Sequence, residues 1–487
     1  MNSLIQFKGS VQRNSLFMKN KNLMRFCLFG LFMVLFFSPC LARDNTTLVV
    51  FSRHTFRGIS KNVGPQKISL PQYGIDIPIP SLSYVQDATP QGLIIAESFA
   101  APGLQEAAAL AVGAIAENKV FDGHWDEVRA ELASERTFWT GLYLIKGIQE
   151  QDAEHNRAIK FTGCPIDPKK DKDAVDAVSS DHPIKVCTSK DNESKAVFLQ
   201  LLKASPDLPK LKESFQNFLN TVRAAIGLTS KVVIPEPVYS EDGSLPKVYD
   251  ELAALASIIE MIADLGPPLP QIFRDRRNRA HLMKSGKVAV QRGVDSLGIR
   301  FFTSEPSPLS DAVSVIPVNY MMSRPQGSHT IVVSHDNMMS ALMSSLGIIS
   351  SNGAPDDWAF FPIESYVFAF GSSNVSIVRM RVEISDPDGA IPGNYGSQVV
   401  WKGSVQQWNE KVMALNERVK TLNLGPGGNT CLNAVTECKA NEINVVFYNR
   451  SPATPLPSLG GVPHHRVFDD PRNSINTRNP NGQFREP

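Results

Sequence analysis

The chain has 487 residues, of which 42% are hydrophobic and 20% charged, and this composition excludes a disordered or fibrous protein. The length allows two or three domains with a sizeable core. The first 42 residues carry five basic residues and no acidic one, so the rest of the chain holds 44 basic and 48 acidic residues, a net charge of −4. That balance leaves no basic excess for binding nucleic acid or an anionic membrane surface.

Residues 1–42 have the features of an export signal. Basic residues precede the apolar stretch "FCLFGLFMVLFF", and the small residues Cys40 and Ala42 are spaced for cleavage by signal peptidase. The apolar stretch is short for a membrane-spanning helix. We therefore predict a signal peptide over 1–42 and a periplasmic or secreted mature chain with no stable membrane anchor after cleavage. A lipoprotein attached through Cys40 is the alternative.

Four cysteines follow the leader, and an even number in an exported protein favours disulfide bonds. Pairing between sequence neighbours would join Cys164 to Cys187 and Cys431 to Cys438. Free thiols are the alternative for either pair. The cysteine spacings do not fit a zinc site, and neither do the two adjacent histidines of the C-terminal tail, so we predict no metal and no cofactor.

The first predicted element is a strand over 46–52, where "TTLVVFS" is β-branched and aromatic. A helix is expected to start at Thr89-Pro90, since a hydroxyl cap followed by proline is typical of a first turn. The segment "LQEAAALAVGAIAEN" continues as helix, and "ERTFWTGLYLIKGI" from Glu135 predicts another. Residues 165–195 are charged and without periodicity, which predicts a solvated loop.

From about 196 to 300 the pattern is mainly helical, and "VYDELAALASIIEMIADLG" is its clearest part, ended by Gly266. A second strand is predicted at 328–336, in "SHTIVVSHD". The segment "NMMSALMSSLG" then predicts an amphipathic helix closed by Gly347.

These elements predict an α/β core built from both ends of the chain around a helical insertion. The predicted parts are a discontinuous α/β domain over 43–145 and 300–440, a mainly helical insertion over 146–299, and a loosely held tail over 441–487, rich in Pro, Asn and Arg. In such sheets, ligands bind beyond the carboxyl ends of the strands. His54 and His335 each end a predicted strand, so we expect their side chains to converge on one crevice.

The first strand ends in "RHTFR", which places a histidine between two cations. Arg53 and Arg57 each offer a planar fork of donors suited to phosphate oxygens. A neutral imidazole at His54 is a nucleophile toward phosphorus, giving a covalent intermediate that water hydrolyses. Asp336, beside His335, is suited to protonate the departing alkoxide. A surface salt-bridge cluster is the structural alternative for an isolated motif of this kind.

Other patterns point to no second chemistry. The sequence has neither a Walker-type glycine loop nor a G-x-S-x-G elbow. Ser334, His335 and Asp336 do not form a triad by adjacency, because triads are assembled in space. Five further histidines lack partners at ligand spacing and are predicted to be structural or exposed: His124, His155, His182, His281 and His329.

The motif "RHTFR" early in the chain, "ERT" at 135–137 and the late strand ending in "SHD" together resemble the histidine acid phosphatases, the phytase and glucose-1-phosphatase branch of the histidine phosphatase superfamily. The resemblance covers order, spacing and architecture over about 55 to 370, including "TPQG" at 89–92. It implies a phosphoglycerate-mutase-like α/β sandwich, with a central mixed sheet flanked by helices and a smaller helical insertion.

The resemblance also implies roles for six residues. His54 matches the nucleophile that becomes phosphohistidine, and Asp336 matches the proton donor. The matches for phosphate binding are Arg53, Arg57, Arg136 and His335. Arg136 by itself would be an ordinary helix-surface arginine.

The chain departs from the family's motifs at three places. Thr55 replaces the glycine of the first motif, and Ile59 replaces its proline. Asn337-Met338 follow the His-Asp pair, where family members often have Thr-Asn or Ser-Asn. Thr55 is expected to alter the pocket wall more than the chemistry, whereas the last departure bears on substrate preference.

We therefore predict an exported acid phosphatase that is metal-independent, acts on a small-molecule phosphate monoester and is most active at acidic pH. Inositol hexakisphosphate, sugar phosphates, nucleotides and aryl phosphates all remain open as substrates. Two alternatives are a catalytically silent exported protein that binds phosphorylated ligands, and a phosphotransfer mutase. The export signal argues against the mutase.

Overall fold

The structure is a computed structural model that describes residues 45–56, 66–79, 88, 90–115, 119–131, 135–151, 157–164, 208–241, 245–263, 308–348, 362–383, 394–421, 441–447 and 475–478, with isolated helical positions between 196 and 289. The chain divides into two units, 1–44 and 45–487, and all described residues belong to the second. The predicted signal peptide therefore lies outside the described residues.

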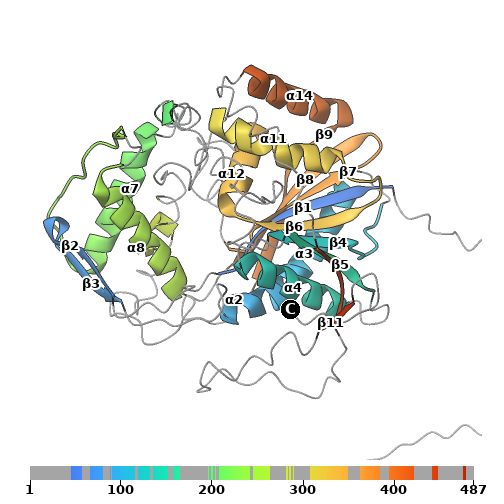
Figure 1. Cartoon of the computed structure of the whole chain (residues 1–487), viewed down its shortest axis with the longest axis horizontal. Coiled ribbons are helices and arrows are strands. Elements are labelled where there is room, and N and C mark those ends of the chain that lie inside the picture. The colour runs from blue at the N-terminus through green and yellow to red at the C-terminus, as the bar shows by residue number, and fades with distance from the viewer. Residues whose placement is uncertain are drawn as a thin grey trace, which may run out of the picture. The chain divides into compact units, whose positions relative to one another are not determined.

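The described residues form a nine-stranded mixed sheet (Figure 1). Its strands, in spatial order, are β11 (Ile475–Arg478), β10 (Asn441–Phe447), β5 (Ile159–Cys164), β4 (Glu127–Glu131), β6 (His329–Ser334), β1 (Thr47–Arg53), β7 (Ser365–Phe370), β8 (Asn374–Glu383) and β9 (Asn394–Ser404). The four strands β5, β4, β6 and β1 run parallel to one another. The strands on both sides of this group are antiparallel to their neighbours.

Strand β1 lies near the middle of the sheet and is buried along its whole length. Leu48 and Val50 point into one hydrophobic core, while Val49 and Phe51 point into the other. A strand covered on both faces carries a continuous apolar run in place of alternation, which explains why "TLVVF" is apolar at nearly every position. The strand predicted over 46–52 is confirmed as β1.

Helices cover both faces of the sheet (Figure 1). One core contains the π-helical turn η2 (Ala96–Ala100), the end of α2 (Pro90–Ile95) and the helices α3 (Ala101–Ile115) and α4 (Glu135–Gln151). The other core contains α11 (Pro308–Met322), α12 (Asp336–Ser345) and α14 (Val405–Thr421). The predicted fold class, a mixed sheet flanked by helices, is therefore confirmed. The helix starts predicted at Pro90 and Glu135 are confirmed too.

Helix α4 packs directly on η2 because Gly147 has no side chain. A Cβ atom at Gly147 would lie 2.2 Å from the carbonyl oxygen of Glu97, so no other residue fits there without a backbone shift. The neighbouring Lys146 donates to Glu97 Oε1 at 2.5 Å. This close approach fixes α4 against the helices that precede it, and α4 carries Arg136 in its first turn.

The helices α7 (Leu208–Ala225) and α8 (Lys247–Ala263) lie in the predicted insertion and pack on each other. The hairpin of β2 (Gln66–Leu70) and β3 (Ile75–Ile79), joined through the turn η1 (Pro71–Tyr73), contacts α8. The buried guanidinium of Arg223 donates to the carbonyl of Tyr73 and to Ser230 Oγ, which ties α7 to this hairpin. A hairpin from the N-terminal part of the chain thus joins the helices of the insertion.

Three strands lie on the other side of the predicted domain boundaries. Strand β5 falls within 146–299 yet belongs to the sheet, and β10 and β11 fall within the predicted tail. Ile159 and Phe161 of β5 alternate into the same core as α3 and α4, which explains the burial of so short a strand. A strand of six residues is defined by the strands that it pairs with, which for β5 are β4 and β10.

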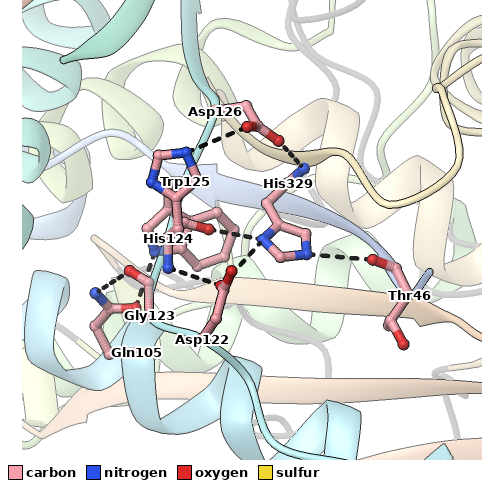
Figure 2. Close-up of polar contacts among 8 residues, drawn as sticks. All are labelled: Thr46, Gln105, Asp122, Gly123, His124, Trp125, Asp126 and His329. Carbon is pink, nitrogen blue, oxygen red and sulfur yellow. Dashed lines mark hydrogen bonds and ion pairs between the residues drawn. The ribbon is translucent and has the colours of Figure 1, made fainter. Parts of the chain in front are cut away.

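Where β6 begins, the buried side chain of His329 lies in a network of polar contacts, shown in Figure 2. His329 Nδ1 lies 2.6 Å from the carbonyl oxygen of His124, and Nε2 lies 3.2 Å from that of Thr46. The backbone N–H of His329 donates to Asp126 Oδ2 at 2.8 Å, and His124 Nε2 lies 3.3 Å from Asp126 Oδ1. The network joins β6 to the residues before β1 and β4, so His124 and His329 serve the structure at the start of β6.

Replacing His329 with leucine is expected to lower the free energy of unfolding by about 1–3 kcal/mol, because the carbonyls of Thr46 and His124 would stay buried without the imidazole. Urea unfolding of the two proteins measures the difference. His281 is exposed and offers a matched control, since His281→Leu removes an imidazole from outside any such network. Equal stability of both variants and the wild type would contradict the structural role of His329.

Candidate active site

His54 and His335 lie side by side where β1 and β6 end. The two strands are parallel neighbours, and Arg53 pairs with Ser334 in their register, so the residue after each strand emerges at the same edge. The backbone N–H of His54 donates to Ser334 O at 2.9 Å. The two imidazole rings are 5.0 Å apart, centroid to centroid, at an angle of 70°. The structure therefore brings the two histidines into one site.

Two hydrogen bonds define which nitrogen of His54 carries the proton. Nδ1 lies 2.5 Å from the carbonyl oxygen of Thr55, which can only accept, so Nδ1 is the protonated nitrogen. Arg136 Nε, which can only donate, lies 3.1 Å from Nε2. Nε2 therefore holds a lone pair. In the neutral ring, this is the nitrogen that can attack an electrophile.

The surroundings of His54 favour its neutral form. The residue is only 3% exposed, and burial is the largest cause that holds the pKa of His54 well below its usual value of 6.5. The charges of Arg136, Arg53 and His335 lower this pKa further, while Asp336 opposes them. The imidazole thus keeps its lone pair in mildly acidic solution, where an exposed histidine is largely protonated.

Arg53 and Asp336 form an ion pair beside His54. Arg53 Nη2 lies 3.2 Å from Asp336 Oδ2, and the two side chains are 3% and 15% exposed. His335 has an extended backbone, with φ −109° and ψ 157°, so the chain turns from β6 into α12 at this residue. Asp336 is the first residue of α12, where the helix dipole stabilises a negative charge. A carboxyl group is thus held at the partly open side of the site.

Arg136 reaches the site from α4, on the other side of His54. It is in the first turn of that helix and is half-buried. Thr140 follows one turn later on the same face, fully buried, and its hydroxyl donates to Arg136 O at 2.6 Å. No motif marks Thr140, although its four-residue spacing from Arg136 in "ERTFWT" indicates the same helix face.

A buried carboxylate supports the backbone beside His54. The side chain of Glu364 is fully buried and accepts hydrogen bonds from two arginines of β8, Arg379 at 2.6 Å and Arg381 at 3.0 Å. The preceding residue, Ile363, has a φ of 66°, which is strained for a β-branched side chain, and its N–H donates to His54 O at 3.3 Å. Glu364 thus anchors a strained turn beside His54. Nothing in the local sequence marks Glu364 for this role.

Five of the six residues implied by the resemblance come together here: Arg53, His54, Arg136, His335 and Asp336. Arg57 lies outside the described residues, as do Cys187, Cys431 and Cys438. Cys164 ends β5, but its side chain is not described. Among the described residues, no group of three or more His, Cys, Asp and Glu side chains is arranged to hold a metal ion. No helix in the described segments is both long and apolar enough to cross a bilayer.

Comparison with known proteins adds likeness of fold. No protein-family model matches the chain, and no curated protein sequence matches it. The phytase of Hafnia alvei, solved in complex with myo-inositol hexakis sulphate, is 15% identical with a TM-score of 0.50, over 79% of this chain and 98% of that one. The phytase of Citrobacter braakii is also 15% identical, with a TM-score of 0.48, over 76% of this chain and 97% of that one.

The fold of this chain is therefore that of a phytase. At 15% identity, the likeness to the Hafnia alvei enzyme establishes a common architecture over nearly all of that protein's length. Phytases are one branch of the family that the motifs "RHTFR" and "SHD" resemble. The motifs resemble a family that includes phytases, and the fold is one that a phytase also has.

Proposed function

We propose that this protein is an exported acid phosphatase that hydrolyses phosphate monoesters through a phosphohistidine on His54, with Asp336 as proton donor. The observation that carries the proposal is the state of the His54 ring, a buried neutral imidazole whose Nε2 lone pair faces a cationic group. A phosphate ester needs both features, since its oxygens bind cations and its phosphorus accepts a lone pair.

In the first half of the reaction, the Nε2 lone pair forms a bond to phosphorus while the bond from phosphorus to the ester oxygen breaks. Asp336 transfers its proton to that oxygen, so the alcohol leaves neutral. The phosphorylated ring becomes cationic, and its Nδ1–H remains bonded to Thr55 O, which stabilises the new charge. In the free site, Arg53 favours the carboxylate form of Asp336, and bound phosphate offsets that effect by its own negative charge.

In the second half, water attacks the phosphorus and the bond from phosphorus to Nε2 breaks. The Asp336 carboxylate accepts the proton of that water, which restores the carboxylic acid. His54 returns to the neutral ring with its proton on Nδ1. Inorganic phosphate then leaves, and the enzyme is ready for another substrate molecule.

The phosphate oxygens are proposed to bind Arg53, Arg136 and His335, together with Arg57. Arg136 Nε donates to His54 Nε2 in the free site, so it must turn to a phosphate oxygen when substrate binds. That exchange keeps the lone pair covered until a phosphate is present. Cations held in place in advance stabilise the charge that spreads over the oxygens in the transition state.

The proposed setting is outside the cytoplasm, with residues 1–42 acting as the leader and the cysteines forming disulfide bonds there. The proposed substrate is a small-molecule phosphate monoester, and the phytase fold makes inositol phosphates the first compounds to test. The low pKa of His54 supports activity at acidic pH, because the nucleophile stays neutral where Asp336 is more readily protonated.

Rapid quenching of the purified protein during turnover tests the proposal. Aryl phosphate or inositol hexakisphosphate is mixed with the enzyme and stopped in alkaline denaturant, because the phosphorus–nitrogen bond is labile in acid. We expect a mass increase of one phosphoryl group that maps to the His54 peptide, release of inorganic phosphate, and no effect of a chelator. Ligand binding without either signal would instead identify a phosphate-binding protein, and transfer to an acceptor without phosphate release would identify a mutase.

A further inference from the structure

The hydroxyl group of Thr140 connects the two sides of the candidate site. Thr140 is fully buried on α4, one turn after Arg136. Its Oγ1 accepts a hydrogen bond from the backbone N–H of Thr55 at 3.0 Å and donates one to Arg136 O at 2.6 Å. A single hydroxyl thus acts as acceptor and donor at once.

These two bonds close a ring of contacts around the nucleophile. Thr55 follows His54 directly in the chain, and Arg136 Nε donates back to His54 Nε2 at 3.1 Å. The ring therefore runs from His54 through Thr55, Thr140 and Arg136 to His54 again. Every link is a hydrogen bond or a covalent connection, and at Arg136 the ring passes from the backbone carbonyl to the side-chain Nε.

Thr55 adds a second tie on the same side. Its hydroxyl donates to the carbonyl oxygen of Gly92, in α2, at 2.6 Å. The resembled motif has glycine at this position, which offers no hydroxyl. Thr55 is fully buried, so the bond to Gly92 is shielded from water. Thr55 is therefore held by α4, through the bond from its backbone N–H to Thr140, and by α2, through the bond from its hydroxyl to Gly92.

We infer that Thr140 is a positioning residue that holds Arg136 in register with Nε2 of His54, through a hydroxyl that must both accept and donate. The inference rests on the proposed function, in which Arg136 first covers Nε2 and then binds phosphate. Thr140 touches neither substrate nor the reacting atoms. It acts on the reaction through the placement of Arg136.

The variants Thr140→Val and Thr140→Ser separate shape from hydrogen bonding. Valine has the size of threonine without the hydroxyl, so it breaks both bonds, while serine retains them. We expect kcat/KM to fall roughly 10- to 100-fold in Thr140→Val, since small displacements of a positioning group have effects of this order. In Thr140→Ser we expect a change of no more than about threefold on the same physical grounds.

The pH dependence of kcat/KM distinguishes a positioning role of Thr140 from one that only stabilises the fold. Burial is the largest cause of the low pKa of His54, and the charge of Arg136 is the next. The other groups that face His54 are Arg53 on β1 and His335 and Asp336 at the start of α12, whereas the hydrogen bonds of Thr140 go to Thr55 and Arg136. Displacing Arg136 raises the pKa of His54, so the fall of kcat/KM on the acid side moves to higher pH in Thr140→Val.

A matched control is Thr221→Val on α7. Thr221 Oγ1 donates to Asn217 O at 2.8 Å, the same four-residue bond in an exposed setting on another helix. We expect neither rate nor pH profile to change in this variant. In an Arg136→Ala background, Thr140→Val is expected to add no further shift, because the group that it places is gone.

The decisive measurement is the titration of the His54 ring by NMR, which needs no turnover. An unchanged titration in folded Thr140→Val would overturn the inference, whatever the activity. A shifted titration in a protein that releases no phosphate would leave the inference standing and refute the proposed function. Thr140→Ala, which also lacks the hydroxyl, serves for the same comparison where the valine variant does not fold.

Discussion

Replacing His54 with alanine is expected to lower kcat on the order of 10⁴-fold or more, because the atom that attacks phosphorus is removed and the remaining groups only bind and polarise the ester. The variant should still bind inorganic phosphate, since Arg53, Arg136 and His335 remain. Burst-phase and steady-state release of phosphate from an aryl ester measure the loss. Calorimetric titration with phosphate measures the binding that remains.

The exposed residue His281 is the control for this experiment, because His281→Ala removes an imidazole that takes part in none of the contacts described for the candidate site. It should leave turnover unchanged. Substantial turnover in His54→Ala would refute the assignment of the nucleophile. A phosphorylated peptide containing another residue would then identify the group that takes its place.

Replacing Asp336 with asparagine is expected to distinguish substrates by their leaving group. An alkyl phosphate releases a strongly basic alkoxide and needs a proton, so its kcat/KM, which covers the steps up to the phosphohistidine, should fall about 10²- to 10⁴-fold. An activated aryl phosphate such as p-nitrophenyl phosphate releases a stable phenolate, so its loss should be far smaller. The ratio of the two losses is the quantity to measure.

Comparing the two losses also separates proton transfer to the leaving group from the other effects of replacing Asp336. Attack by water on the phosphohistidine comes after the steps that kcat/KM measures, so its slowing does not enter, and the loss of the ion pair with Arg53 is common to both substrates. Only proton transfer to the leaving group depends on the ester. Equal losses for alkyl and aryl substrates would therefore contradict the role of Asp336 as the leaving-group acid.

The convergence of His54 and His335 was predictable from the sequence because it follows from local patterns. Each histidine ends a short apolar run, and the carboxyl ends of parallel strands share one edge of a sheet. The structure pairs β1 with β6 in that parallel arrangement. The helix that begins at Asp336 was predictable for a similar reason, since its apolar residues repeat with helical spacing.

The contacts of Arg136 could not be predicted from the residues around it. Its partner His54 is 82 residues away, and nothing in the turn "ERT" indicates which side chain it will meet. Only the resemblance to a known family singled it out. The sequence does not mark Thr140, because the backbone N–H that it binds is 85 residues away, or Glu364, because its partners are two arginine side chains of a neighbouring strand.

The sequence did not predict strands β5 and β10 either, because their pairing partners are also distant in sequence. Strands β5 and β10 are short, and what makes them strands is the pairing between Phe161 and Ile443 and between their neighbours. The hairpin of β2 and β3 lies among residues predicted to belong to the sheet domain, yet it packs with α8. Which elements a short hairpin packs on depends on the apolar surface that the larger elements leave exposed after they have packed.

The central place of β1 has a consequence for how the molecule is made. Residues 47–53 leave the ribosome early, but their partners in β6 and β7 are at 329–334 and 365–370. Residues 47–53 therefore stay without these partners while about 280 further residues are synthesised. Closing a loop of that length has an entropic cost. The edge of the sheet that carries His54 and His335 can therefore form only after β6 and β7 have been synthesised.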